Sequence, residues 1–146
     1  MVRIRRFNPD KDLLSIADIA NRNLGEEYKL TMFINVYEAW PDGFLIAESM
    51  GTYIGTIISI MNEPQVARVL VLAVESDYRR KGIGGKLLGS FIQKAVLRGI
   101  ERLTLEVRMS NKEAISFYNK HRFKIVSTIP AYYRDGESAF VMERGI

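Results

Sequence analysis

A basic, glycine-rich loop between an apolar strand pattern and a helix pattern constrains the fold of this chain more than any other feature. Residues 69–74 are apolar, residues 75–78 are polar, and residues 79–86 read Arg-Arg-Lys-Gly-Ile-Gly-Gly-Lys before an apolar helical pattern continues. Glycines allow successive backbone N–H groups to point toward one centre, and the first turn of a helix adds the positive end of its dipole. The sequence therefore predicts an anion cradle at a strand-to-helix turn.

The spacing of the loop residues indicates which anion is bound. A nucleotide P-loop needs a hydroxyl residue after its lysine, but Leu87 follows Lys86. The order Arg79-x-x-Gly82-x-Gly84 also differs from the Gly-x-Gly-x-x-Gly pattern of dinucleotide folds. It resembles the acyl-CoA pyrophosphate loop of the GNAT N-acetyltransferases, and an ordinary strand-to-helix turn is the alternative. The resemblance implies acetyl-CoA as the cofactor. The implied cofactor-binding residues are Leu72, Ala73, Val74, Arg79, Arg80, Lys81, Gly82, Ile83, Gly84, Gly85, Lys86, Asn111 and Tyr118.

Composition narrows the classes of function. The chain has 146 residues, which suits a single domain spanning 1–146. It has no cysteine and one histidine, which excludes a cysteine nucleophile and leaves no metal site to expect. No segment is apolar over the length of a membrane span, so we expect a cytoplasmic protein without membrane contact. Basic residues cluster only in the loop 79–86, which favours one local anion site over nucleic-acid binding.

Strand and helix patterns alternate in a way that predicts one α/β layer structure. Strands are predicted at residues 1–7, 44–50, 53–61, 67–74, 102–107, 122–129 and 138–142. Helices are predicted at residues 8–21 and 26–39, from the glycine loop to residue 98, and at residues 111–120. The GNAT resemblance implies their assembly into a mixed, mostly antiparallel central sheet of about seven strands, flanked by about four helices.

A second motif follows the predicted strand 102–107. Residues 106–118 read Glu-Val-Arg-Met-Ser-Asn-Lys-Glu-Ala-Ile-Ser-Phe-Tyr. Taken alone, Asn111 is a helix cap and Tyr118 is a core tyrosine on the helix face of Ala114. The string is also similar to one that is characteristic of GNAT enzymes. That resemblance implies that Asn111 contacts the pantetheine arm and that the Tyr118 hydroxyl lies beside the cofactor sulfur.

Two further segments narrow the substrate. Residues 23–28 read Asn-Leu-Gly-Glu-Glu-Tyr, and residues 130–139 read Pro-Ala-Tyr-Tyr-Arg-Asp-Gly-Glu-Ser-Ala. In isolation they are a helix-capping acidic pair and a hairpin with an Asp-Gly turn. Both resemble the substrate loops of protein N-terminal acetyltransferases, and the resemblance spans nearly the whole chain. It implies that nascent or mature protein N-termini are the substrates. The implied substrate-binding residues are Leu24, Glu26, Glu27, Tyr28, Tyr132 and Tyr133.

Acyl transfer to an amine requires a neutral amine and a proton for the departing thiolate. A protein α-amine has a pKa of about 8, against about 10.4 for lysine, so a weak base suffices. The candidate bases are Glu26 and Glu106, acting directly or through a water. Glu106 matches the base of the ribosomal-protein alanine acetyltransferases, and its alternative is an ion pair with Arg102 or Arg108. Tyr118 is the candidate proton donor, and without a cysteine the simplest scheme is direct attack in a ternary complex.

Three functions are compatible with these motifs. The first is acetylation of protein N-termini, for which we expect small first residues such as serine, alanine or threonine. The second is acetylation of a polyamine or a lysine side chain, and the third is a non-catalytic module that binds acyl-CoA or a protein. An auxiliary subunit or a ribosomal partner is left open. One departure from the GNAT pattern is Arg122, which stands where a glycine normally ends the helix, so we expect strain in that turn.

Overall fold

The computed structural model describes residues 1–146 and is built on one seven-stranded sheet with the order β1-β2-β3-β4-β5-β7-β6. Neighbouring strands are antiparallel except β4 and β5, which run parallel. This architecture confirms the predicted mixed, mostly antiparallel α/β sheet with four helices. The strands are β1 (Arg3–Arg6), β2 (Phe44–Ser49), β3 (Thr52–Glu63), β4 (Val66–Val74), β5 (Arg102–Arg108), β6 (Lys124–Ile129) and β7 (Ala139–Gly145). The helices are α1 (Pro9–Leu24), α2 (Leu30–Ala39), α3 (Ile83–Arg98) and α4 (Lys112–Lys120), with short 3₁₀ turns at Pro41–Gly43 and Ser76–Tyr78.

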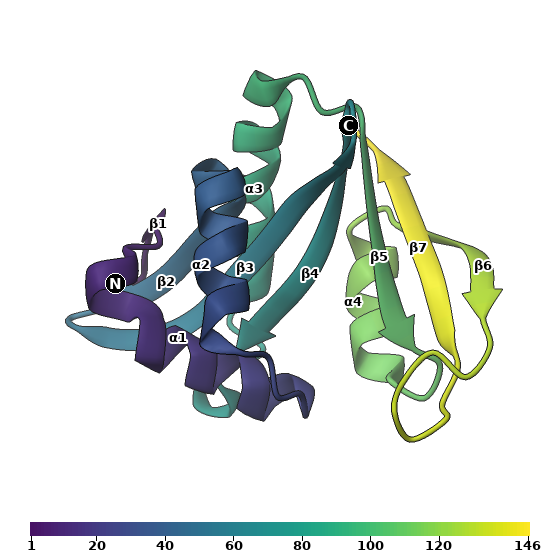
Figure 1. Ribbon diagram of the computed structural model, residues 1–146, viewed down its shortest axis with the longest axis horizontal. Coiled ribbons are helices and arrows are strands. Elements are labelled where there is room, and N and C mark those ends of the chain that lie inside the picture. The colour runs from purple at the N-terminus through teal and green to yellow at the C-terminus, as the bar shows by residue number, and fades with distance from the viewer.

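The sheet separates two apolar cores. Alternate residues of a strand point to opposite faces, so Leu45 and Ala47 of β2 pack with α3, while Phe44 and Ile46 pack with α1 and α2. In Figure 1, α1 and α2 lie in front of the sheet and α3 lies behind it. Strands β2, β3 and β4 therefore contribute to both cores, whereas β5 contributes to one. None of the helices is both long enough and apolar enough to cross a membrane.

The connection between α1 and α2 differs from the predicted one. Helix α1 continues to Leu24, and Gly25 ends it in the left-handed conformation with φ +64°. Helix α2 begins at Leu30 and not at residue 26. The reason is the Asn21 side chain, which accepts from the N–H of Tyr28 at 2.9 Å and donates to its carbonyl at 3.1 Å. These two bonds hold residues 25–29 outside the helix.

Strands β4 and β5 separate after a short parallel contact. Their register covers three residue pairs and ends at Arg68 and Thr104. Strand β4 then carries a bulge at Leu70 against β3, and a bulge bends a strand and increases its twist. Beyond this point the two strands diverge toward the lower part of Figure 1, where the α1–α2 connection and the β6–β7 connection also lie.

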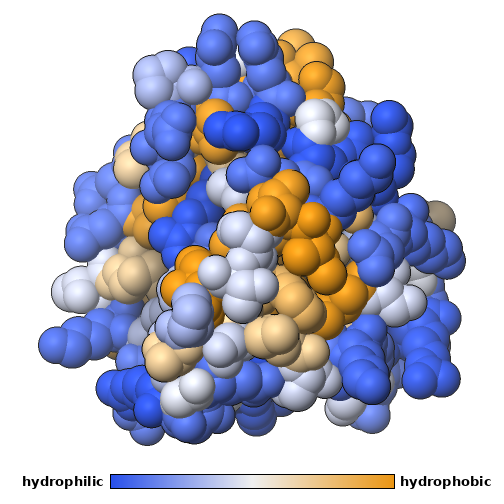
Figure 2. Space-filling model, turned by 90° about the vertical axis from the view of Figure 1, so that its right-hand side faces the viewer, coloured by the Kyte–Doolittle hydropathy of each residue, from blue (hydrophilic) through white to orange (hydrophobic).

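Strand β6 forms the outer edge of the sheet. It exposes the apolar residues Ile125 and Val126. Figure 2 views this side of the molecule and shows apolar side chains gathered in its middle, with hydrophilic ones around them. The register with β7 shifts at Val126, and such irregularity makes an edge strand a poorer template for pairing with another chain.

Candidate functional site

A cavity of about 380 Å³ lies where β4 and β5 diverge. Its walls come from both strands, from the α1–α2 connection, from α4 and from the β6–β7 connection. The cavity therefore brings together residues from three motifs that are far apart in the sequence. The predicted site residues that line it are Leu24, Glu26, Tyr28, Leu72, Glu106, Asn111, Tyr118 and Tyr133.

The glycine loop forms an open helix start beside this cavity. Helix α3 begins without a capping side chain, and Gly82 before it has φ +78°, which favours glycine. A Cβ atom on Gly84 would lie 3.3 Å from the Phe117 ring, and one on Gly85 would lie 3.3 Å from the His121 ring. The glycines thus allow α4 to pack closely against the first turn of α3. The N–H groups of that turn, with the positive end of the helix dipole, fit a diphosphate group.

The other residues predicted for cofactor binding differ in how they are placed. Arg79 donates from Nε to the Val74 carbonyl at 2.9 Å and from its guanidinium to Asn23 Oδ1 at 2.6 Å. Its side chain therefore joins two segments of the protein. The Ala73 and Ile83 side chains are buried in the two cores, so only their backbone groups can contact a ligand. The remaining basic residues of the loop are Arg80, Lys81 and Lys86, and all three are exposed.

Asn111 and Tyr118 stand on the α4 side of the cavity. The Asn111 side chain accepts from the Ala114 N–H at 3.1 Å, so it caps α4 and also lines the cavity. The Tyr118 ring packs edge-on against Phe123. Burial raises the pKa of the Tyr118 phenol, and the nearby Tyr133 raises it further. The phenol therefore stays protonated at neutral pH and is able to donate a proton in the cavity.

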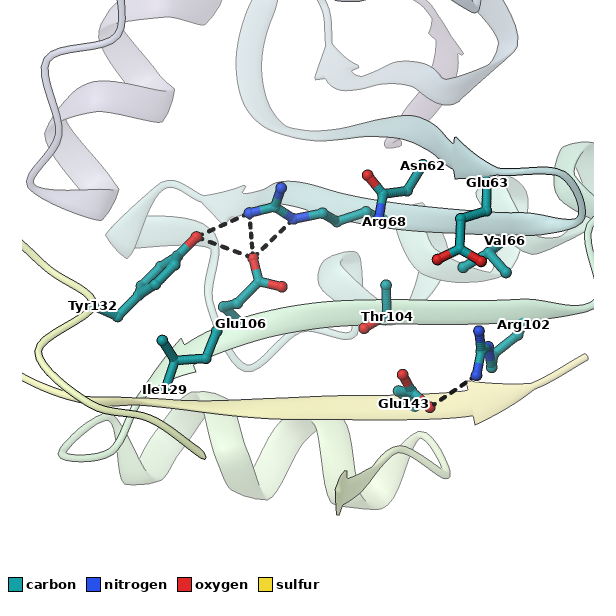
Figure 3. A pocket seen from close by; sticks show the side chains of 10 residues that line it. All are labelled: Asn62, Glu63, Val66, Arg68, Arg102, Thr104, Glu106, Ile129, Tyr132 and Glu143. Carbon is teal, nitrogen blue, oxygen red and sulfur yellow. Dashed lines mark hydrogen bonds and ion pairs between the residues drawn. The ribbon is translucent and has the colours of Figure 1, made fainter. Parts of the chain in front are cut away.

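Glu106 lies between this cavity and a second one of about 370 Å³ on the polar face of the sheet, which Figure 3 shows. Its Oε1 atom accepts from Nε of Arg68 at 2.8 Å and from a second nitrogen of the same guanidinium. The hydroxyl of Tyr132 donates to Oε1 at 3.2 Å. The side chain of Glu106 is 14% exposed, so this carboxylate is largely enclosed by its partners.

The alternative pairing of Glu106 with Arg102 or Arg108 is wrong. Arg102 bonds Glu143 at 3.5 Å. The guanidinium of Arg108 points to the β6–β7 connection. Residues two or four positions apart on one strand share a face but are separated along it, whereas a side chain on the neighbouring strand can lie directly alongside.

Arg68 is absent from the set of residues predicted from the sequence. Its signal is a single charged residue within the otherwise apolar run of β4, since a charge in a covered strand needs a partner of opposite sign. Burial is the largest single effect and acts to lower the pKa of Arg68, but the hydrogen bonds and the negative charge of Glu106, together with Tyr132, outweigh burial and raise the pKa. The guanidinium is therefore held as a cation.

The β6–β7 connection is fixed by Arg108. Its guanidinium donates to Asp135 at 2.9 Å and to Glu137 at 3.0 Å, and it lies 4.1 Å from the centre of the Tyr133 ring. The backbone turns at Gly136, with Tyr133 accepting from its N–H. This arrangement puts the Tyr133 ring into the cavity.

The two predicted substrate loops contain three tyrosines, and one of their glutamates lies outside the cavity. Burial raises the pKa of Tyr28, of Tyr132 and of Tyr133, in the last case to about 12. All three hydroxyls are therefore protonated at neutral pH and can form hydrogen bonds. Glu27 does not line the cavity: its side chain is 84% exposed and faces Arg134 of the other loop at 3.8 Å.

Known proteins resemble this chain in sequence and in fold. The N-alpha-acetyltransferase daf-31 of Caenorhabditis elegans is 32% identical over 142 residues, which cover 92% of this chain and 78% of that protein. The structure of Ard1 from Thermoplasma volcanium is 34% identical, with a TM-score of 0.94 over 99% of this chain and 97% of that one. Arabidopsis thaliana Naa50, solved in complex with the bisubstrate analogue CoA-Ac-MVNAL, is 25% identical, with a TM-score of 0.85 over 99% of both chains. Residues 13–123 match the sequence model of the acetyltransferase (GNAT) family. The chain therefore belongs to the acetyltransferase (GNAT) family.

Proposed function

We propose that this protein transfers the acetyl group of acetyl-CoA to the α-amino group of protein N-termini. The observation that carries the proposal is the single cavity at the divergence of β4 and β5, to which the strand before the glycine loop, the α4 motif and both substrate loops contribute. The relative named N-alpha-acetyltransferase and the neighbour solved with CoA-Ac-MVNAL support it. In this proposal residues 1–146 act as one domain.

On the donor side, the first turn of α3 and the exposed basic side chains of its loop bind the phosphate groups of acetyl-CoA. Asn111 contacts the pantetheine arm from the cavity wall. Acetyl-CoA supplies an activated thioester when it is bound. Backbone N–H groups on the edge of β4 that faces the gap, toward Val74, donate to the carbonyl oxygen of that thioester. Since the chain has no cysteine, we propose direct transfer in a ternary complex.

On the acceptor side, the hydroxyls of Tyr28, Tyr132 and Tyr133 bind the peptide backbone at its first residues. We assign to Glu106 the removal of a proton from the α-ammonium group, directly or through a water, because Glu106 lines both cavities. Glu26 lines the first cavity from the α1–α2 connection and attracts the ammonium group. A weak carboxylate base is sufficient for an amine whose pKa is about 8.

Tyr118 completes the proposed chemistry as the proton donor to the departing CoA thiolate. Its hydroxyl belongs to a partly buried ring on the wall of the cavity, and its raised pKa keeps the proton in place until the thiolate forms. The reaction then ends with a neutral thiol and an amide, and the Tyr118 proton is replaced from solvent.

The proposal also covers substrate choice and location. Contacts to the backbone and α-amine leave the first side chain less constrained, so we propose small first residues. We propose a cytoplasmic location, where new N-termini are made.

The test is a measurement of CoA release with peptides that differ in the first residue, with the same peptides blocked at the α-amine, and with spermidine. We expect release with free peptides that begin with serine, alanine or threonine, and no release above background with blocked peptides. Release with blocked lysine-containing peptides or with spermidine alone would replace the proposal by lysine or polyamine acetylation. Binding of acetyl-CoA without release in any reaction would indicate a non-catalytic module.

A further inference from the structure

Arg68 stands at the point where the two central strands separate. It is the last residue of β4 in register with β5, opposite Thr104. Its side chain crosses from β4 to Glu106, two residues further along β5, so the ion pair spans the strands just as their backbone pairing ends. At 29% exposure the guanidinium is mostly enclosed, and an ion pair enclosed in this way is less screened than one in solvent.

Three side chains form a closed triangle of hydrogen bonds at this point, as Figure 3 shows. Arg68 donates to Glu106 and, at 2.9 Å, to the hydroxyl of Tyr132. The same hydroxyl donates to Glu106. All the bonds to Glu106 reach one oxygen, Oε1, and Oε2 accepts none from the protein. The triangle thus orients the carboxylate and leaves one oxygen for a further donor.

We propose that Arg68 is a positioning residue that aims Glu106 at the substrate amine and docks the β6–β7 connection over the cavity through Tyr132. The inference rests on the proposed function. Arg68 makes two bonds to one carboxylate oxygen, and these restrict rotation of the Glu106 side chain more than a single contact does. Its bond to Tyr132 joins β4 to the connection that carries the substrate tyrosines.

Arg102 provides a matched control, because it lines the same second cavity as Arg68. Arg102 on β5 pairs with Glu143 on β7 at 3.5 Å, and this pair is more exposed than the one between Arg68 and Glu106. Both arginines line the second cavity and appear in Figure 3, but Arg102 bonds Glu143 and not Glu106, the residue that also lines the cavity at the strand divergence. Arg102→Met therefore removes an arginine from the second cavity and leaves the contacts of Arg68 with Glu106 and Tyr132 in place.

The test compares Arg68→Met, Arg68→Lys, Glu106→Gln and Arg102→Met in steady-state kinetics with a peptide substrate. We expect Arg68→Met to lower kcat at least about tenfold and Arg68→Lys to recover part of that loss, while acetyl-CoA affinity changes less than about twofold. Arg102→Met should match the unaltered protein. In the Glu106→Gln background, Arg68→Met should cause less than about a twofold further loss, because residues that act through one another are not additive.

A second measurement does not depend on activity. Hydrogen exchange of the amides of residues 131–134 should become faster in Arg68→Met and in Tyr132→Phe, and should remain unchanged in Arg102→Met. Tyr132→Phe keeps the ion pair, so it tests the docking contact even where Arg68→Met unfolds. Unchanged exchange in both variants, or equal kinetic losses in Arg68→Met and Arg102→Met, would overturn the inference. If the unaltered protein acetylates no α-amine, the proposed function fails, while the exchange result still decides whether Arg68 docks the connection.

Discussion

Tyr118 is the single residue whose hydroxyl the proposed chemistry needs most. Tyr118→Phe removes that hydroxyl and keeps the ring that packs against Phe123. We expect kcat to fall about 10²-fold or more, since a positioned acid typically contributes about 10²- to 10⁴-fold. The melting temperature and the dissociation constant for acetyl-CoA should stay close to those of the unaltered protein. Initial rates and isothermal titration measure the two effects.

Tyr37→Phe is the matched control for this variant. Tyr37 packs against Phe7 beside the other apolar core, on the opposite side of the sheet from α3. Its hydroxyl should be dispensable for turnover. If Tyr118→Phe retains the same kcat as Tyr37→Phe, another group protonates the thiolate and the assignment of Tyr118 is wrong.

Arg122 carries backbone strain that the sequence predicts. It adopts φ +73° two residues after the end of α4, at the position where the GNAT pattern has glycine. The left-handed conformation costs a residue with a Cβ atom about 1 kcal/mol, and glycine avoids this cost. Glycine also makes the unfolded chain more flexible, which offsets part of the gain in stability. We expect Arg122→Gly to raise the free energy of unfolding by up to about 1 kcal/mol in urea titrations. Lys120→Gly, in the last turn of α4, should lower it by a similar amount, and destabilisation by both changes would refute the account of this turn.

At the scale of elements, a polar network joins the end of α1 to the end of β4. The Asn23 side chain donates to Glu75 at 2.9 Å and accepts from Arg79 at 2.6 Å, while Arg22 pairs with Glu75. The network therefore connects the proposed substrate loop at residues 23–28 with the glycine loop that follows Glu75. Binding of acetyl-CoA at the glycine loop should therefore change the affinity for the peptide, and binding of the peptide should change the affinity for acetyl-CoA.

Asn23→Ala tests this connection. We expect the acetyl-CoA dissociation constant and the peptide KM both to rise by up to about tenfold, because hydrogen bonds to charged groups contribute about 1.5–3 kcal/mol and 1.4 kcal/mol is a factor of ten. Asp18→Ala removes only an exposed pair with Arg22 on the same helix and should change neither constant. An increase in one constant alone, as measured by titration and initial rates, would mean that the network serves only one loop.

The elements themselves were largely predictable because their signals are local. Alternating apolar residues, the cap at Asn111 and the glycine loop place strands and helices within a few residues of their observed ends. The misplaced ends depend on distant partners. The start of α2 is set by Asn21, and β7 extends to Gly145 because it pairs with Arg102 of β5. Such long-range contacts produce no repeating pattern of residues in the sequence, so they could not be predicted from it.

The site was predictable in part for the same reason. Tyr118 and Tyr133 belong to motifs, and both line the cavity. Arg68 belongs to no motif, and its role follows from the register that ends β4–β5 pairing at its position. Its partner Glu106 was identified, but the arginine that holds it was not. A lone charge in an apolar strand shows that a partner exists without showing which strand supplies it.

For the whole molecule, one enclosed ion pair ties the N-terminal elements together. Asp12 of α1, with a fully buried side chain, accepts from Arg5 of β1 and from Tyr53 of β3, and Arg5 also bonds Glu48 of β2. Burial acts to raise the pKa of Asp12, but the hydrogen bonds from Arg5, Tyr53 and the chain backbone outweigh it and lower the pKa from 3.8 to about 2.

This pair should make stability depend on pH in the acid range. Because the folded pKa of Asp12 is below its unfolded value, its contribution is complete above about pH 4 and is lost as the pH falls toward 2. The lowering corresponds to about 2 kcal/mol, since each pKa unit is worth about 1.4 kcal/mol. Asp12→Asn should remove this pH dependence and destabilise the protein by several kcal/mol, about 3–5 for a broken enclosed pair. Urea unfolding between pH 2 and 6 measures both.

The exposed Arg6–Asp42 ion pair provides the control for Asp12→Asn. Both of its side chains are well exposed, so Asp42→Asn should change the free energy of unfolding by less than about 1 kcal/mol and leave the acid dependence in place. Equal effects of Asp12→Asn and Asp42→Asn would show that enclosure of the first pair has no part in holding these elements together.

The measurement that tests the central claim most directly is tandem mass spectrometry of one peptide that carries both a free α-amine on serine and an internal lysine, after reaction with acetyl-CoA. The account predicts a single added acetyl group, found on the α-amine, and its loss in Tyr118→Phe. An acetyl group on the lysine with the α-amine left free would contradict the account, because the cavity formed by the two substrate loops would then not be a site for protein N-termini.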